Sequence, residues 1–152
     1  MLPLYLAACG LACGLERLHG RPFVASLMGH LVARTLGGRR LAGAAEGETL
    51  YEVAWLPAVG FRAAAQTWGE VVLVTPEAYR VTSGERRVSP DLLAHERCHV
   101  AQFRRLTSFG FWVRYAAAWA WGLLRYRDPF RAYWDLALER EARAAAARPD
   151  DA

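Results

Sequence analysis

The chain of 152 residues contains no Lys, no Ile and no Asn, so all 19 of its basic residues are Arg, against 15 acidic residues. The formal net charge is +4. Because the Arg residues are scattered among acids and not gathered in one run, the charge gives little support for a nucleic-acid partner, and we expect none.

Cysteine is scarce as well, and Cys9, Cys13 and Cys98 are the complete set. An odd number without paired spacings argues against a disulfide framework and excludes a four-cysteine zinc site. A reducing compartment is the simpler interpretation, so the sequence predicts a cytoplasmic protein.

No hydrophobic run reaches the roughly 20 residues that a membrane-spanning helix needs. Residues 1–15 carry no charge, but they lack the basic start and the cleavage site of a signal peptide. In residues 109–126 the apolar run is interrupted by Arg114 and Arg125. We expect both segments to pack as helices on the core. Peripheral membrane contact through these apolar helices is the alternative, and LAAC at 6–9, which resembles a lipoprotein signal, leaves export open.

The length corresponds to one domain, and we assign residues 1–152 to a single unit. The breaker GRP at 20–22 separates two helical patterns, which predicts an N-terminal helical hairpin over residues 1–36. Residues 37–48 are rich in Gly and charge and are predicted to form a flexible loop. Residues 50–147 make up the remaining core.

The core combines short strand patterns with longer helical ones. EVVLV at 70–74 is a β-branched apolar run that predicts a strand, and residues 79–82 predict a second strand that pairs with it. Ser89 can cap a helix and Pro90 suits its first position, so a helix should run from Pro90 to about residue 106. Further helices are expected at 109–126 and 130–147. The fold class is therefore α+β, mostly helical, with a small β-sheet packed on the helix that begins at Pro90.

That helix carries the sequence LLAHERCHVAQ at 92–102. Residues four apart lie on one helical face, so His95 and His99 can hold a single zinc ion about 2.1 Å from each ring nitrogen. Glu96 is rotated about 100° from His95, where it can act on a water molecule as a general base without ligating the ion. Gln102 continues the histidine stripe and can hydrogen-bond to a ligand. The alternative is a surface helix with two solvated histidines. Because the residues around the motif are largely apolar, we instead expect the imidazoles to be buried, where they need polar partners.

A catalytic zinc usually has three protein ligands, so a third must come from elsewhere in the chain. The stretch ALEREARA at 137–144 offers Glu139 and Glu141 on a downstream helix. Helical periodicity over residues 130–147 aligns Glu141 with the apolar side chains of Phe130 and Trp134 and so favours Glu141. Both glutamates remain candidates on the residues alone.

The motif HExxHxxQ of His95 to Gln102, followed by an aromatic helix and then EREAR at 139–143, resembles the small bacterial gluzincin-type zinc metallopeptidases called minigluzincins. The resemblance covers residues 68–143. In gluzincins the third ligand is a Glu in an E-x-x-A-D pattern, and Glu139 with Ala142 fits that register, so the resemblance favours Glu139.

The chain departs from the gluzincin pattern at two points. The Asp that orients a ligand histidine falls at Arg143, so that role passes to another group, for which Asp135 and Glu141 are candidates. No residue is assigned by the pattern to stabilise the oxyanion of the reaction, and the candidates are Tyr133, Tyr126 and His30.

The resemblance also implies an edge strand that binds the substrate backbone just before the metal helix. The segment placed for this role comprises Val71, Val72, Leu73 and Val74, although an ordinary sheet strand fits the same residues.

The function that the resemblance implies is zinc-dependent hydrolysis of peptide bonds in a peptide or protein substrate. His95, His99 and Glu139 would hold Zn²⁺, and Glu96 would carry a proton from the activated water to the leaving amine. Two alternatives come from other classes of protein. A noncatalytic zinc-binding or interaction module would keep the ligands without turnover, and a membrane-associated helical protein would use its apolar helices to contact lipid.

Overall fold

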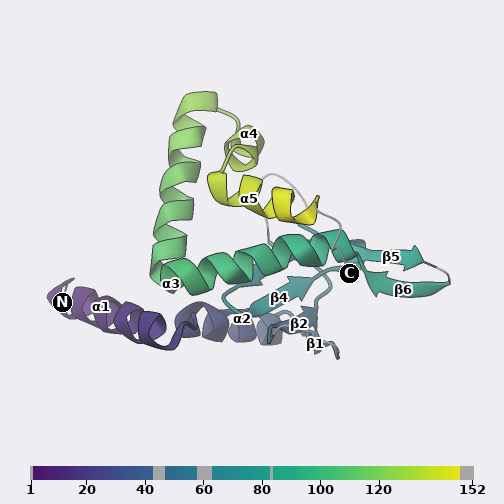
Figure 1. The fold of residues 1–152 in the computed structure, drawn as a ribbon, viewed down its shortest axis with the longest axis horizontal. Coiled ribbons are helices and arrows are strands. Elements are labelled where there is room, and N and C mark those ends of the chain that lie inside the picture. Colours follow the sequence, from purple (N-terminus) through teal and green to yellow (C-terminus); the bar gives the residue numbers. More distant parts are fainter. Residues whose placement is uncertain (1, 43–46, 58–62, 83, 148–152) are drawn as a thin grey trace.

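The computed structural model describes residues 2–42, 47–57, 63–82 and 84–147, with the side chains of 2–8 and 82 left out. The described residues form five α-helices and six strands, so the predicted α+β, mostly helical class is confirmed (Figure 1). Their bounds are α1 Leu2–His19, α2 Phe23–Thr35, β1 Arg39–Arg40, β2 Thr49–Glu52, β3 Ala65–Trp68, β4 Val71–Val74, η1 Pro76–Ala78, β5 Tyr79–Thr82, β6 Glu85–Val88, α3 Pro90–Tyr126, α4 Pro129–Trp134 and α5 Ala137–Ala146.

Four strands form a mixed sheet in the order β1-β2-β4-β3. β4 pairs in parallel with β2 and antiparallel with β3, so both of its edges are occupied. Successive β4 side chains point to opposite faces of the sheet. Val71 and Leu73 pack with Ala33 of α2, whereas Val72 and Val74 pack with Val100 of α3. The core therefore has three layers, with the sheet between α2 and the first half of α3.

The strand predictions are partly correct. The strands at 71–74 and 79–82 form, but β5 pairs with β6 in a separate hairpin, so the expected pairing of 79–82 with β4 is wrong. β1 lies inside the predicted loop 37–48, and residues 43–46 of that loop lie outside the described residues. The short strands β2 and β3 were not predicted, because neither contains an alternating apolar pattern.

The predicted helices at Pro90 to 106 and at 109–126 both form, as two arms of α3 that meet at a sharp bend (Figure 1). At the bend Thr107 has φ 66° and ψ 167°, a conformation that a β-branched residue adopts only when its surroundings hold it there. Pro90 occupies the first turn of the helix as expected, whereas Ser89 makes no side-chain capping bond. The bend separates the arm that carries the histidines from the aromatic arm.

A buried carboxylate holds the bend and two other helix ends together. Glu16 of α1 accepts hydrogen bonds from the backbone N–H of Val24, 2.8 Å away, and from the backbone N–H of Ser108, 2.7 Å away. The hydroxyl of Ser108 donates to Glu16 at 2.6 Å and accepts from the N–H of Ala25 at 2.8 Å. These bonds satisfy amide groups at the start of α2 and of the second α3 arm, which the helices cannot satisfy internally.

α1 and α2 both form, but they do not fold back on each other as the predicted hairpin would. Within the described residues α1 packs mainly on α3, whereas α2 packs on β3 and β4, and the two helices follow one another along one side of the molecule (Figure 1). No helix in the described ranges is both long enough and apolar enough to cross a membrane.

The single helix predicted over 130–147 is interrupted. α4 begins at an N-cap, where the Asp128 carboxylate accepts from the N–H of Phe130 at 2.9 Å, and it ends at Asp135. Leu136 then adopts an extended conformation (φ −58°, ψ 132°) and is buried, and α5 starts on a new axis. This break alters which residues of α5 face the rest of the protein.

Candidate metal centre

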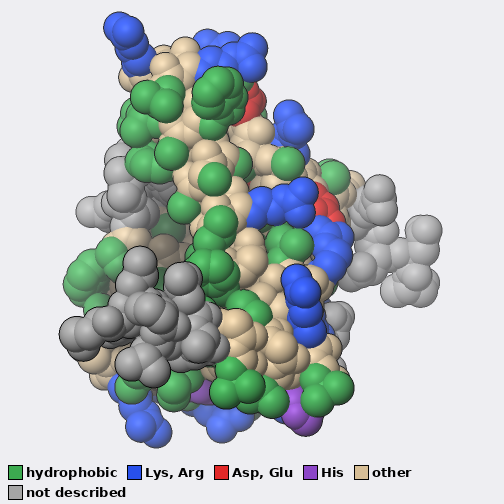
Figure 2. Space-filling view, turned by 90° about the vertical axis from the view of Figure 1, so that its left-hand side faces the viewer, with side chains coloured by type: hydrophobic (Ala, Val, Ile, Leu, Met, Phe, Trp, Pro, Cys, Tyr) green, Lys and Arg blue, Asp and Glu red, His purple; other side chains and the backbone are tan. Residues whose placement is uncertain are grey.

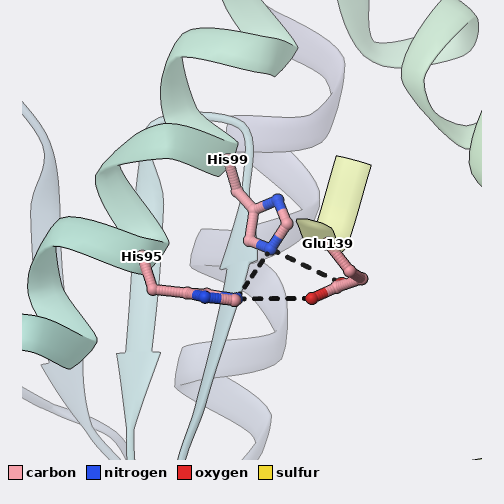
Figure 3. A group of neighbouring side chains, drawn as sticks. All are labelled: His95, His99 and Glu139. Atoms are coloured by element: carbon pink, nitrogen blue, oxygen red, sulfur yellow. Dashed lines mark hydrogen bonds and ion pairs between the residues drawn. The ribbon is translucent and has the colours of Figure 1, made fainter. Parts of the chain in front are cut away.

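Three potential metal ligands come together from two helices (Figure 3). His95 and His99 lie one turn apart on α3, and their Nε2 atoms are 3.2 Å apart. Glu139 of α5 approaches both rings, with Oε2 3.3 Å from His95 Nε2 and Oε1 3.5 Å from His99 Nε2. The structure thus joins the two predicted histidine ligands with Glu139.

These distances suit a shared cation. Two ligand atoms, each about 2.1 Å from a tetrahedral zinc ion, lie about 3.4 Å apart, which matches the separations at this site. Glu139 Oε2 is buried, and beside its 3.3 Å contact with the His95 ring it has no well-formed hydrogen bond within the described chain, an uncommon state for a carboxylate oxygen. Two imidazoles and a carboxylate are a donor set that zinc accepts, so the residues present fit the ion.

The electrostatics of the site favour positive charge at this position. Burial alone would raise the pKa of Glu139, but the imidazoles of His95 and His99 and the Tyr115 hydroxyl hold that pKa well below its usual range. Burial alone would lower the pKa of His99, yet Glu139 and Glu96 raise it above its usual value. The carboxylate is therefore ionised, as a ligand must be, and the same negative groups that favour a proton on His99 would attract a metal cation.

Gln102 orients the His99 ring. Its Oε1 atom lies 2.8 Å from His99 Nδ1, which makes Nδ1 the protonated nitrogen and leaves the Nε2 lone pair for coordination. The Gln102 amide nitrogen donates to the carbonyl of Leu138 at 3.0 Å and to Glu141 at 3.1 Å. Gln102 therefore lies beside the site as predicted and also ties α3 to the helix that carries Glu139.

The other two predicted acids lie outside the ligand cluster. Glu141 forms a two-point ion pair with the guanidinium of Arg105, with its carboxylate 3.0 Å from Nη2, and reaches His99 only through Gln102. Asp135 is exposed at the end of α4 and interacts with Tyr126. The prediction that Asp135 orients a ligand is therefore not supported by its position.

Glu96 is buried beside the histidines. Its Oε2 atom accepts a hydrogen bond from the Thr67 hydroxyl of β3 at 2.6 Å, and the carboxylate lines the same cleft as the ligands. Thr67 was not recognised in the sequence, since a single Thr in a short strand carries no local signal. The hydrogen bond from Thr67 holds the Glu96 carboxylate close to the His95, His99 and Glu139 group, but Glu96 is not a member of that group.

Two tyrosines complete the polar lining of the site. Tyr115, on the second arm of α3, donates to Glu139 Oε1 at 2.8 Å, and Tyr133 of α4 lines the cleft near the same carboxylate. Burial and the charge of Glu139 raise the pKa of both phenols, so both remain protonated hydrogen-bond donors. Of the other oxyanion candidates, His30 contacts Tyr51 at 3.2 Å and Tyr126 lies beside Arg131.

A cleft of about 650 Å³ opens over the three ligands. All four residues of β3, the last strand of the sheet, lie along one side of it. The opposite walls are largely aromatic and come from both arms of α3: Phe103, Phe111, Trp112, Tyr115 and Trp119. The cleft therefore joins a strand edge, an apolar wall and the ligand cluster.

The predicted substrate strand has to be corrected. Val71, Val72, Leu73 and Val74 are all buried, and β2 and β3 occupy the two edges of β4, so these residues do not form an edge strand. A continuous apolar run is typical of a central strand covered on both faces, and that signal was available in the sequence. The strand that borders the cleft is β3.

Comparison of the chain with protein-family models, with curated proteins and with solved structures gives no match. The interpretation of the centre therefore depends on its own geometry.

Proposed function

We propose that the protein is a zinc-dependent metallopeptidase of endopeptidase type. The observation that carries the proposal is the convergence of His95, His99 and Glu139 in a cleft, with the Glu96 carboxylate buried beside them. The three ligands would hold Zn²⁺, which supplies Lewis acidity that makes water more acidic and polarises a carbonyl group.

Glu96 is the proposed general base. Its carboxylate accepts a hydrogen bond from Thr67, which holds it at the cleft surface and leaves the second oxygen to take a proton from water. The same group then returns the proton to the amine that leaves when the peptide bond breaks. Because Glu96 is one residue from His95 on the helix, its distance from the reaction centre is set by helix geometry.

Tyr133 is proposed to stabilise the oxyanion of the reaction, and Tyr115 is proposed to orient the Glu139 carboxylate. Both phenols are half-buried and protonated. Tyr115 donates to Glu139 Oε1 at 2.8 Å, and Tyr133 lines the cleft and also interacts with that carboxylate. A neutral phenol near a developing oxyanion stabilises it without a change of protonation. Tyr115 instead positions the Glu139 carboxylate.

The substrate proposed for the cleft is an extended peptide with a large apolar side chain. β3 lies at the end of the sheet order and all of its residues border the cleft, so it can pair with a substrate backbone. Trp112 and Trp119 form an apolar wall nearby, which would bury an aromatic or branched side chain of the substrate. The partner is therefore a peptide or an unfolded protein segment.

The test is the substitution Glu96→Gln, which keeps the shape of the side chain but removes its basicity. We expect zinc content to stay near one ion per chain, while cleavage of a library of peptides rich in aromatic residues falls by at least about 100-fold. Elemental analysis and mass spectrometry of the products provide the two measurements.

The control is Glu85→Gln, a change of an exposed glutamate on β6 that should leave both measurements unchanged. Cleavage that persists in Glu96→Gln at the wild-type rate would show that the activity is a contaminant. A wild-type protein that holds zinc and cleaves no peptide would be a noncatalytic zinc-binding module.

A further inference from the structure

α2 is an amphipathic helix with an unusual distribution of side-chain sizes. The residues that it buries are small, namely Ala25, Gly29 and Ala33. Gly29 and Ala33 pack against the sheet, and Ala25 packs against Phe103 and Phe111 of α3. Gly29 is so close to the sheet that a Cβ atom there would meet the Cβ atoms of Trp68 and Val71 at 2.7 Å. Most of the large apolar side chains of the helix are therefore exposed, and Val32 alone among them packs on the core cluster of the sheet.

These outward side chains continue from α2 onto α1. The exposed apolar residues recur at helical spacing within each helix, so α1 and α2 each have an exposed apolar face. We name the two together the outer apolar face: Leu11, Leu15, Leu18, Phe23, Val24, Leu27, Met28 and Leu31. Leu18 is 78% exposed and Leu27 is 61% exposed. Figure 2 shows apolar and Arg side chains along its lower edge, the side on which Figure 1 places α1 and α2. An exposed apolar surface of this length is typical of an interaction site.

The charge of the chain is concentrated on the same segment. Residues 1–40 contain five Arg and one acidic residue, Glu16, whereas residues 41–152 contain 14 of each and are balanced. Glu16 of α1 is buried, with its carboxylate against the first turn of α2, so it contributes no negative charge to the surface. Arg17 in the last turn of α1 and Arg34 in the last turn of α2 are exposed, and within the described ranges neither has an acidic partner. The partner of this face should therefore be both apolar and negatively charged.

We propose that the outer apolar face of α1 and α2 binds the surface of a bilayer that contains anionic lipids. Leu and Phe side chains on one side of a helix with Arg at its margins are the features by which helices lie in the interface between headgroups and acyl chains. The Arg side chains would contact lipid phosphates, and their alkyl stems would extend along the apolar layer. Among the described residues that line the cleft, none belongs to α1 or α2, so the bound protein would keep its cleft free.

The experiment is flotation of the full chain with phosphatidylcholine vesicles, with and without phosphatidylglycerol. We expect binding to the anionic vesicles only, and we expect it to weaken as salt is raised, because salt screens the attraction of Arg to the headgroups. Leu27→Gln combined with Leu31→Gln should weaken binding by at least about tenfold. Arg34→Gln should weaken it about fivefold, the effect of one basic residue near a charged surface.

The matched controls lie on the second arm of α3, where Trp121 and Leu124 are also exposed apolar residues and Arg114 is an exposed base. Their substitution by Gln should leave flotation unchanged, and the melting temperature of every variant should stay near that of the wild type. Equal loss in test and control variants, equal binding to neutral vesicles, or no flotation at all would overturn the proposal. A dimer in sedimentation that Leu27→Gln with Leu31→Gln dissociates, without flotation of the wild type, would assign the face to a second copy of the chain instead.

Discussion

Glu139 and Glu141 lie two residues apart on one short helix but have different surroundings. Glu139 is 3% exposed and faces two imidazoles and the Tyr115 hydroxyl, whereas the Glu141 side chain is 44% exposed and pairs with Arg105. Only Glu139 is placed to share a cation with His95 and His99. The difference comes from their positions on α5. Glu139 lies on the buried face of the helix with Leu138 and Ala142, whereas Glu141 does not.

At the scale of single residues, the two glutamates should differ in their effect on zinc binding. Glu139→Ala should remove stoichiometric zinc binding, because it opens the coordination sphere, while Glu141→Ala should weaken zinc binding by about tenfold at most through Gln102. Competition with a chromophoric chelator measures both affinities. A larger loss in Glu141→Ala than in Glu139→Ala would exclude Glu139 as the third ligand.

At the scale of elements, the position of α2 depends on small side chains. The backbone at Gly29 lies so close to β3 and β4 that a Cβ atom there would collide with them. Ala25 and Ala33 flank Gly29 on the same helical face. This close approach lets α2 cover one face of the sheet while α3 covers the other. It also explains why the larger residues of α2 are left outside.

The prediction for this element compares two helical glycines. Gly29→Ala should destabilise the protein by about 1–3 kcal/mol, because the added methyl collides with Trp68 and Val71. Gly14→Ala on α1, where a Cβ meets nothing within 4 Å, should stabilise it by about 0.5–1 kcal/mol through helix propensity. Urea denaturation followed by circular dichroism measures both free energies of unfolding. Changes of the same sign in both variants would disprove the steric explanation.

At the scale of the whole molecule, the candidate metal centre links parts of the fold that are far apart in sequence. His95 and His99 belong to the first arm of α3, and Glu139 belongs to α5, which packs against that arm. An ion bound to all three therefore joins the two helices, and its binding free energy adds to the stability of the native state alone.

The corresponding prediction concerns metal removal. Zinc at about 100 times its dissociation constant should add about 2.7 kcal/mol to the free energy of unfolding, which for a chain of this size raises the melting temperature by about 5–10 °C. A chelator should reverse the increase, and Mg²⁺, which prefers oxygen ligands, should have little effect. His99→Ala should abolish the shift. An equal shift in that variant would mean that zinc binds elsewhere.

Much of the site follows from local sequence. The spacing of His95 and His99 places both rings on one helical face whatever the rest of the fold does, and Glu96 is fixed next to them by the same geometry. Ser89 and Pro90 indicate where this helix begins, and the β-branched run at 71–74 predicts a strand. Each of these features depends on neighbours within a few residues.

Other features depended on contacts between distant segments. Periodicity favoured Glu141, whereas the resemblance favoured Glu139. The chain leaves helical conformation at Leu136, so a periodicity that runs from Phe130 through the break does not describe α5. Thr67 and Tyr115 reach the site from a strand and from beyond the bend at Thr107, and nothing next to them in sequence indicates the carboxylates that they contact. The edge position of β3 likewise depends on which strands pair with β4. The sequence by itself determined the residues that share a helical face, because those positions follow from local backbone geometry. Only the tertiary structure decided which glutamate lies beside the two histidines and which strand borders the cleft, because long-range packing selects among sites that are locally equivalent.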